Sequence, residues 1–145
     1  MSNISSTKKS SPPNSGVSKT QKRILVVDDE EAIRKILVNS LKEEGFLTLE
    51  ASNGKEAVAS TLSNHPDLIL LDLLMPEMGG MEALKAIRKD TWGAEVPVII
   101  LTNLNADNED LIEGVVYNKP ICYLIKSDWK LHDVVEKVKD VLQTK

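Results

Sequence analysis

The sequence contains one cysteine, Cys122, and very few aromatic residues. A single cysteine cannot form an internal disulfide, which fits a reducing compartment, and we expect it to be a small buried hydrophobe in a strand. Aromatic residues make up only 3% of the 145 residues, so the core must consist mainly of leucine, isoleucine and valine. The sequence also lacks an apolar run long enough to cross a membrane and an N-terminal signal peptide. A cytoplasmic protein is therefore the default expectation.

Acidic residues are missing from the first 22 positions, which hold four lysines and little that could be buried. This composition predicts a disordered tail over residues 1–22. Residues 23–145 then carry 14 of the 18 basic residues and all 22 acidic ones, a formal net charge of −8. A domain this acidic is a poor candidate for binding nucleic acid through its phosphates. It is a better candidate for a bound cation or a basic protein partner.

Short apolar runs alternate with segments of helical periodicity along the rest of the chain. Strands are predicted over residues 23–27, 46–51, 67–71, 96–101 and 121–125, and a helix is predicted after each of them. Five β-α repeats predict an α/β fold with a doubly wound five-stranded parallel sheet and five helices. A single domain over residues 23–145 accounts for the whole pattern and leaves no residues for a second one.

The predicted helices carry apolar residues at spacings of three and four. The first helix is closed by Gly45, and Asn53-Gly54 is predicted to form a turn into the second, which covers about residues 55–63. Ser127 is a possible cap for the last helix. We expect these side chains to face the sheet: Ile33, Ile36, Leu37 and Leu41 in the first helix, and Ala57, Val58, Thr61 and Leu62 in the second.

Polar residues follow the apolar runs at the points where the strands end. Asp28 and Asp29 follow the first strand, Asp72 the third, Thr102 the fourth and Lys126 the fifth. The carboxyl ends of parallel strands share one edge of the sheet, where open α/β sheets bind ligands. Carboxylates gathered there repel one another unless a cation lies among them. One or two carboxylates completed by waters and a phosphate suit Mg²⁺, which makes this edge a candidate magnesium site.

The same residues suit phosphoryl transfer. A carboxylate such as that of Asp72 can act as a nucleophile and form an aspartyl-phosphate. Lys126 can neutralise a phosphoryl oxygen, and Thr102 can donate a hydrogen bond to another. Taken singly, each residue has a simpler explanation, since aspartates often cap helices or start turns, threonines end strands and lysines are solvated. His65 and His132 show no metal-ligand spacing and are expected at the surface.

From about Arg23 to Gln143 the sequence resembles the receiver domain of two-component response regulators. The resemblance rests on four motifs: Ile24-Leu25-Val26-Val27-Asp28-Asp29-Glu30, the segment from Pro66-Asp67 through Asp72 to Pro76 with Met78-Gly79-Gly80, Thr102, and Tyr123-Leu124-Ile125-Lys126. It implies the flavodoxin-like receiver fold.

The resemblance also implies how a phosphoryl group is received. Asp72 would be the phosphoacceptor, supplied by a histidine kinase or a histidine phosphotransfer protein. Magnesium would be held by Asp28, Asp29, Asp72 and the backbone carbonyl of Leu74. Such a protein is a phosphoacceptor in signalling and not an enzyme with turnover.

Two further roles follow from the resemblance. Lys126 and Thr102 would contact the phosphoryl group, and Thr102 with Tyr123 would form a switch that remodels the face of helix four, strand five and helix five. Because no output domain is encoded, a stand-alone regulator would signal to an unknown downstream protein by direct contact. It would be a monomer or a phosphorylation-dependent dimer, without nucleic acid or membrane as a partner.

The sequence departs from the family pattern in three places. Ser127 follows Lys126 where the family usually has proline, Asn103 replaces a small residue, and residues 114–122 do not follow the usual spacing before strand five. Leu74 and Leu104 are apolar where other members often carry polar groups near the phosphoryl. Since neither can orient an attacking water, we expect slow self-dephosphorylation.

Three other functions explain the pattern less well. A flavin or nucleotide site needs a glycine-rich or hydroxyl-rich turn after the first strand, whereas Asp28-Asp29-Glu30-Glu31 repels an anion. A phosphatase of the haloacid dehalogenase type needs a second acid two residues after the nucleophile, where Leu74 stands. A degenerate receiver that only binds partners would lack site residues, and all five are present here.

Overall fold

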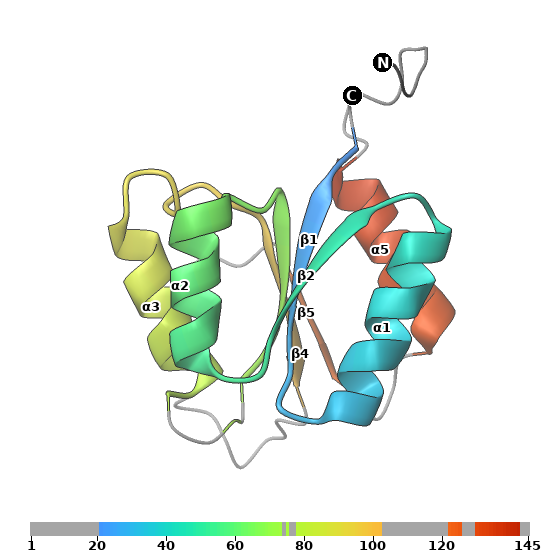
Figure 1. Ribbon diagram of the computed structural model, residues 1–145, viewed down its shortest axis with the longest axis horizontal. Helices are drawn as coiled ribbons and strands as arrows, with labels where there is room; N and C mark the ends of the chain where they lie inside the picture. The colour runs from blue at the N-terminus through green and yellow to red at the C-terminus, as the bar shows by residue number, and fades with distance from the viewer. Residues whose placement is uncertain (1–20, 74, 76–77, 103–121, 126–129, 143–145) are drawn as a thin grey trace, which may run out of the picture.

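The computed structural model describes residues 21–73, 75, 78–102, 122–125 and 130–142, in which strands and helices alternate (Figure 1). The strands are β1 (Arg23–Val27), β2 (Leu47–Ala51), β3 (Leu68–Asp72), β4 (Val98–Thr102) and β5 (Cys122–Ile125). The helices are α1 (Glu31–Glu43), α2 (Gly54–Asn64), α3 (Gly80–Lys89) and α5 (Leu131–Leu142). The helix predicted between β4 and β5 lies outside the described residues.

All five strands run parallel, in the order β2-β1-β3-β4-β5. The chain places β2 on one side of β1 and then crosses to β3 on the other side, so that β1 and β3 form the switch point of the sheet. Their register pairs Val27 with Leu71, and the next residue of each chain segment, Asp28 and Asp72, therefore lies beside the other. The predicted doubly wound, five-stranded parallel sheet is confirmed.

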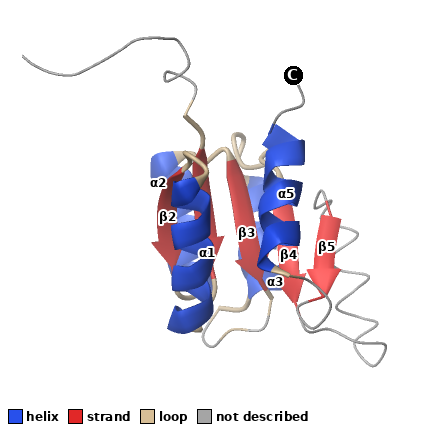
Figure 2. Ribbon diagram, turned by 90° about the vertical axis from the view of Figure 1, so that its right-hand side faces the viewer, coloured by secondary structure: helices blue, strands red, loops and turns tan. Residues whose placement is uncertain are grey.

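Helices cover both faces of the sheet, with α1 and α5 on one face and α2 and α3 on the other (Figures 1 and 2). Successive strand residues point alternately to the two faces, as the pleat requires. Leu25, Ile69 and Ile100 belong to the core under α2 and α3, whereas their neighbours Ile24 and Leu70 belong to the core under α1 and α5. Both cores are almost wholly aliphatic, as predicted. Among the described residues, no helix combines the length and apolarity needed to cross a bilayer.

β2, β3 and β4 each begin one or two residues later than predicted. β3 begins at Leu68 and includes Asp72. Asp67 directly before it contacts Arg23 of β1 twice, since its backbone N–H donates to the Arg23 carbonyl and its carboxylate accepts from the Arg23 backbone N–H, both at 2.8 Å. β4 begins at Val98 and not at residue 96, directly after Pro97, which has no N–H to donate. Asp72 is therefore the last residue of the central strand and not the first residue beyond it.

Two side chains predicted to face the sheet point outward. Ile36 is 53% exposed and Leu62 is 42% exposed. The buried stripe of α1 consists of Leu37, Val38 and Leu41, and Ile36 lies to one side of it. The spacing of apolar residues in α1 allows more than one face of the helix to be the buried one. The structure buries the face that contains Val38, and this leaves Ile36 exposed.

The helix starts use different capping residues. Asn53 caps α2 by accepting a hydrogen bond of 2.9 Å from the backbone N–H of Glu56. α5 begins at Leu131, and the backbone N–H of Lys130 donates to the carboxylate of Asp133 at 3.1 Å. Ser127, which the sequence offers as a possible cap for this helix, lies outside the described residues.

Candidate functional site

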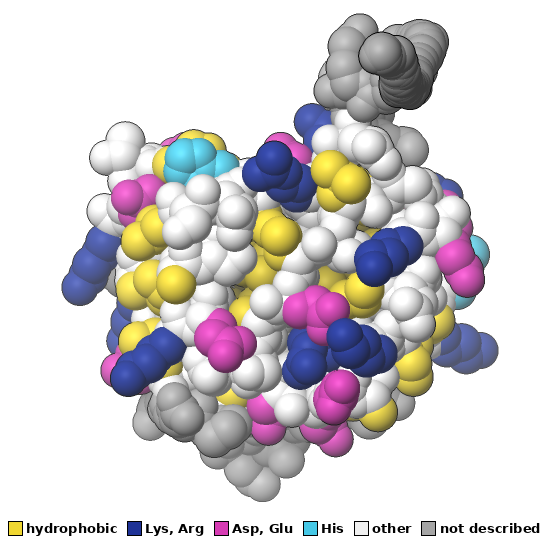
Figure 3. All heavy atoms as spheres, in the orientation of Figure 1, with side chains coloured by type: hydrophobic (Ala, Val, Ile, Leu, Met, Phe, Trp, Pro, Cys, Tyr) yellow, Lys and Arg dark blue, Asp and Glu magenta, His cyan; other side chains and the backbone are white. Residues whose placement is uncertain are grey.

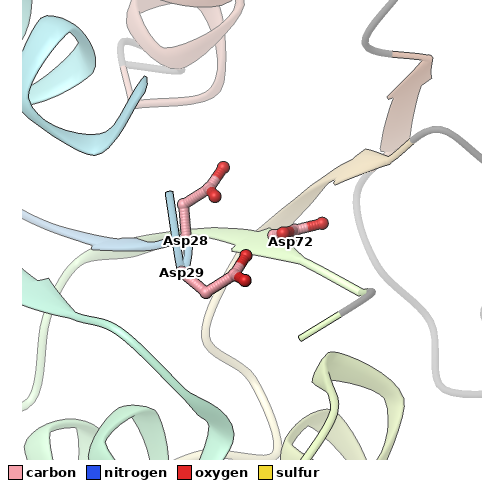
Figure 4. Close-up of side chains that lie close together, drawn as sticks. All are labelled: Asp28, Asp29 and Asp72. Carbon is pink, nitrogen blue, oxygen red and sulfur yellow. The ribbon is translucent and has the colours of Figure 1, made fainter. Parts of the chain in front are cut away.

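Three carboxylates meet at the ends of β1 and β3 (Figure 4). One oxygen from each of Asp28, Asp29 and Asp72 lies within 4.8 Å of the others. Asp28 and Asp72 are buried, with 1% and 4% of their surface exposed, whereas Asp29 is exposed. The sequence prediction that these acids converge at one edge of the sheet is confirmed by this geometry.

The end of β1 fixes the position of Asp28. Its backbone N–H donates to the carbonyl of Ala51 at 3.1 Å, which extends the pairing with β2 by one residue. Its carboxylate oxygen Oδ1 accepts a hydrogen bond of 2.9 Å from the backbone N–H of Glu30. Glu30 is the N-cap of α1 and makes no side-chain cap. Asp28 therefore closes a turn before the helix, and neither Asp28 nor Asp29 serves as its cap.

Arg34 of α1 stabilises the same turn through the backbone carbonyl of Asp28. Its Nη1 donates to the carbonyl of Asp28 at 2.8 Å, and its Nε forms an ion pair of 2.9 Å with Glu50 of β2. Lys35 contacts the second oxygen of Glu50 at 3.0 Å. The hydrogen bond from Arg34 lowers the pKa of Glu50 below its ordinary value. Figure 3 shows acidic and basic side chains mixed over this part of α1 and β2.

The loop that follows Asp72 is tied back at two points that the sequence did not reveal. The backbone N–H of Gly80 donates to the carbonyl of Leu73, and that of Gly54 donates to the carbonyl of Met78, both at 2.9 Å. A Cβ on Gly54 would stand only 2.6 Å from the Cγ of Met78. Asn53-Gly54 therefore does more than form the turn that the sequence predicts, because Gly54 also binds the loop that follows Asp72.

The remaining predicted site residues are described only in part. Thr102 ends β4 directly after Leu101, which pairs with Asp72, so its backbone lies at the same edge as the carboxylates. Tyr123 lies in β5, in register with Ile100 of β4. The side chains of Thr102, Tyr123 and Cys122, and the whole of Leu74 and Lys126, lie outside what the structure describes. Asn103, Leu104 and Ser127 also lie outside it.

The donor set at this edge fits a hard divalent cation. All three groups are carboxylates, which are the oxygen ligands that Mg²⁺ and similar ions take. Two of them are buried, where repulsion between like charges is stronger than in water. A cation held among Asp28, Asp29 and Asp72 would offset that repulsion. The cluster can therefore hold a metal ion.

Comparison with known proteins gives the family. The model of the response regulator receiver domain matches residues 24–138. A probable transcriptional regulator, ycf27 of Guillardia theta, is 41% identical over 96 residues, which cover 66% of this chain and 36% of that protein. The phosphate regulon transcriptional regulatory protein PhoB of Pseudomonas aeruginosa is 36% identical over 94 residues, which cover 65% of this chain and 41% of that protein. The matched part of the chain thus spans less than half of these curated relatives.

Solved structures agree. The receiver domain of the Francisella response regulator 1452 has a TM-score of 0.75 and 32% identity, over 86% of this chain and 100% of that one. The chemotaxis protein CheY4 of Vibrio cholerae has a TM-score of 0.75 at 24% identity, which supports the fold alone. The family match covers both strands that carry the acidic cluster, and the chain belongs to the family of response regulator receiver domains of two-component signal transduction.

Proposed function

We propose that Asp72 accepts a phosphoryl group in a magnesium-dependent reaction, as the receiving step of a signalling pathway. The observation that carries the proposal is the convergence of Asp28, Asp29 and Asp72 at the switch point of the sheet, with their oxygens within 4.8 Å. Receiver domains as a family are signalling phosphoacceptors, and Asp72 ends the central strand in this member.

The chain itself provides the nucleophile and the groups around it. Asp72 would attack the phosphorus with one carboxylate oxygen while the bond to the donor breaks, which gives an aspartyl-phosphate and leaves the donor as its free base. Asp28, Asp29, Asp72 and the carbonyl of Leu74 would hold Mg²⁺. The ion, when bound, neutralises charge on the transferred group. Burial of Asp28 and Asp72 strengthens every charge interaction there.

Three further residues complete the proposed site. Lys126 would contact a phosphoryl oxygen as a point charge, and the hydroxyl of Thr102 would donate to another. The backbone of Thr102, at the end of the strand beside β3, supports this role. Thr102 would form the switch with Tyr123 of β5, since a new negative charge at Asp72 attracts the hydroxyl.

The donor would be a histidine kinase or a histidine phosphotransfer protein, and the output would be a contact with another protein. An acidic domain in the cytoplasm, without affinity for nucleic acid or membrane, fits that output. The division into a tail over residues 1–22 and a receiver domain over residues 23–145 remains a prediction, as do a stand-alone architecture and the oligomeric state. Slow loss of the phosphoryl group, argued from Leu74 and Leu104, also remains a prediction, and a phospho-lifetime of seconds would exclude it.

Intact-mass spectrometry tests the proposal directly. The full chain is incubated with Mg²⁺ and acetyl phosphate, with and without a chelator, beside Asp72→Asn and the control Asp140→Asn, an exposed acid on α5. We expect the mass of one phosphoryl group on the wild type and on the control, and none on Asp72→Asn or in the presence of chelator. An adduct that survives in Asp72→Asn would move the site to another residue, and no adduct on the wild type would reduce the chain to a receiver that only binds partners.

A further inference from the structure

A second candidate site lies at the opposite end of the strands from Asp72. An open groove of about 690 Å³ is formed by the α2–β3 loop and the segment that joins α3 to β4. Figures 1 and 2 show both connections at the amino end of the sheet, where β1 also begins. Nothing in the proposed phosphoryl chemistry uses this end of the molecule, so the groove needs an explanation of its own.

The walls of the groove are flat and mainly apolar. The rings of His65 and Trp92 stack with their centroids 4.6 Å apart and their planes 17° apart. Pro66 and Pro97 complete these walls. His65 holds its place as the C-cap of α2, with a left-handed φ of 48°. Aromatic walls of this kind bind proline-containing segments in an extended, polyproline-type conformation.

The rim of the groove is acidic. Asp67, Asp90 and Glu95 all line it. One oxygen of Asp90 accepts hydrogen bonds from the backbone N–H groups of Trp92 at 2.9 Å and Gly93 at 3.1 Å, which fixes the loop that carries the indole. These hydrogen bonds leave the negative charge of the carboxylate in place. The rim therefore favours an occupant with positive charge.

The chain enters the domain beside this groove. The backbone N–H of Arg23 donates to the carboxylate of Asp67 at 2.8 Å, and its guanidinium donates to the carbonyl of Asn64 at 2.7 Å. The first residue of β1 thus contacts the loop that forms one wall. Pro13 precedes Gln21 by eight residues, which span at most about 29 Å when extended. Gln21, whose Nε2 donates to the carbonyl of Gly45 at 3.0 Å, is the anchor of this tether, two residues before the Arg23 that contacts the groove loop.

The composition of residues 1–20 matches the groove. The segment contains Lys8, Lys9 and Lys19, no acidic residue, and the pair Pro12-Pro13. We propose that residues 1–20 dock in the groove of the same chain, with Pro12-Pro13 on the His65–Trp92 stack and lysines at the acidic rim. A short covalent tether raises the local concentration of the segment to about the millimolar range, so weak contacts suffice.

Paramagnetic relaxation in the full chain tests this docking. A nitroxide is attached to Ser10→Cys in a Cys122→Ser background, and amide signals are compared at residues 65, 92 and 95 and at residues 42 and 136, which lie on α1 and α5. We expect several-fold stronger broadening at the groove than on the helices, and its loss at about 1 M salt, where the Debye length is about 3 Å. Equal broadening at both places would overturn the proposal.

Variants separate docking from mere proximity. Glu95→Lys reverses one rim charge on an exposed side chain, and Lys8→Glu with Lys9→Glu reverses two charges in the segment, while Lys55→Glu on α2 is the control. The first two should each abolish the excess broadening, and the control should keep it. Broadening that appears only between a labelled and an unlabelled copy would overturn docking within one chain and assign the groove to a second copy. None of these changes touches the acidic cluster, so the outcome is independent of phosphoryl transfer.

Discussion

The backbone of Asp72 and that of Gly80 approach too closely for any side chain at position 80. A Cβ there would come within 2.7 Å of the Cα of Leu73, and closer still to the carbonyl oxygen of Asp72. The N–H of Gly80 also donates to the carbonyl of Leu73 at 2.9 Å. The start of α3 is thus packed directly on the end of the strand that carries the proposed phosphoacceptor.

Gly80→Ala should therefore destabilise the fold and displace the end of β3. Overpacking of this kind costs about 1–3 kcal/mol, measured as the change in unfolding free energy by urea denaturation. Gly79→Ala is the matched control, since its nearest neighbour would be the carbonyl oxygen of Leu73 at 3.3 Å, a contact that a small shift relieves. Equal losses in the two variants would contradict the role given to the contact with Asp72.

The acidic cluster should make thermal stability depend on Mg²⁺. Asp28→Asn removes one charge but keeps an oxygen that can accept the hydrogen bond from the backbone N–H of Glu30. Binding to the folded state at a hundred times Kd stabilises a protein by about 2.7 kcal/mol. We expect Mg²⁺ to raise the melting temperature of the wild type and of Asp140→Asn, and to have little effect on Asp28→Asn. A full response in Asp28→Asn would show that this carboxylate does not hold the ion.

Adjacent residues of α1 should differ sharply in their contribution to stability. Leu37 is fully buried, and Leu37→Ala should lower the unfolding free energy by about 2–5 kcal/mol. Ile36 is 53% exposed, and Ile36→Ala should change it by no more than about 0.5 kcal/mol. Chemical denaturation of the two variants measures the difference. A large loss in Ile36→Ala would indicate that this side chain is covered in solution.

The start of α2 should lose stability in acid. The backbone N–H and then the hydroxyl of Ser52 donate to the carboxylate of Glu56 and hold its pKa below the ordinary value of 4.5. A lowered folded-state pKa gives stability that is present above the unfolded value and is lost as the pH falls through the folded one. Glu56→Gln should therefore be less stable than the wild type at neutral pH, and the difference should shrink as the pH falls below 4.5 and through the lowered folded-state pKa of Glu56. Urea denaturation of the two proteins at each pH measures the difference, and Glu82→Gln, at an exposed glutamate in the first turn of α3, is the control for loss of a surface charge at neutral pH.

The sheet and the acidic cluster could be predicted because both depend on patterns local in the sequence. The apolar run before Asp72 and the one before Asp28 each predict a buried strand, and parallel strands bring their ends to one edge. The outward direction of Ile36 could not be predicted, since the stripe of α1 is selected by packing against the sheet and α5. The same holds for the stack of His65 on Trp92, which joins two loops that the sequence separates by a whole β-α unit.

The close contact between the backbones of Gly80 and Asp72 could not be predicted from the sequence for a different reason. A glycine after a strand predicts a turn, and nothing in the sequence says which atoms lie where its side chain would be. Gly54 was likewise interpreted only through the turn that it forms with Asn53. Both glycines are explained by the neighbouring backbone, which becomes visible only when the folded chain is described.

The register of β1 with β3 has a consequence for how the chain can change over time. Val27 lies opposite Leu71, and side chains alternate along both strands, so a slip by one residue would exchange the two cores and turn Asp72 away from Asp28. The relative positions of Asp28 and Asp72 are therefore set by the aliphatic residues of β1 and β3, which take no part in the chemistry. As long as the aliphatic side chains of β1 and β3 are preserved, the acidic cluster stays aligned. Surface residues elsewhere can then be substituted, and the domain can gain new partners without loss of this alignment.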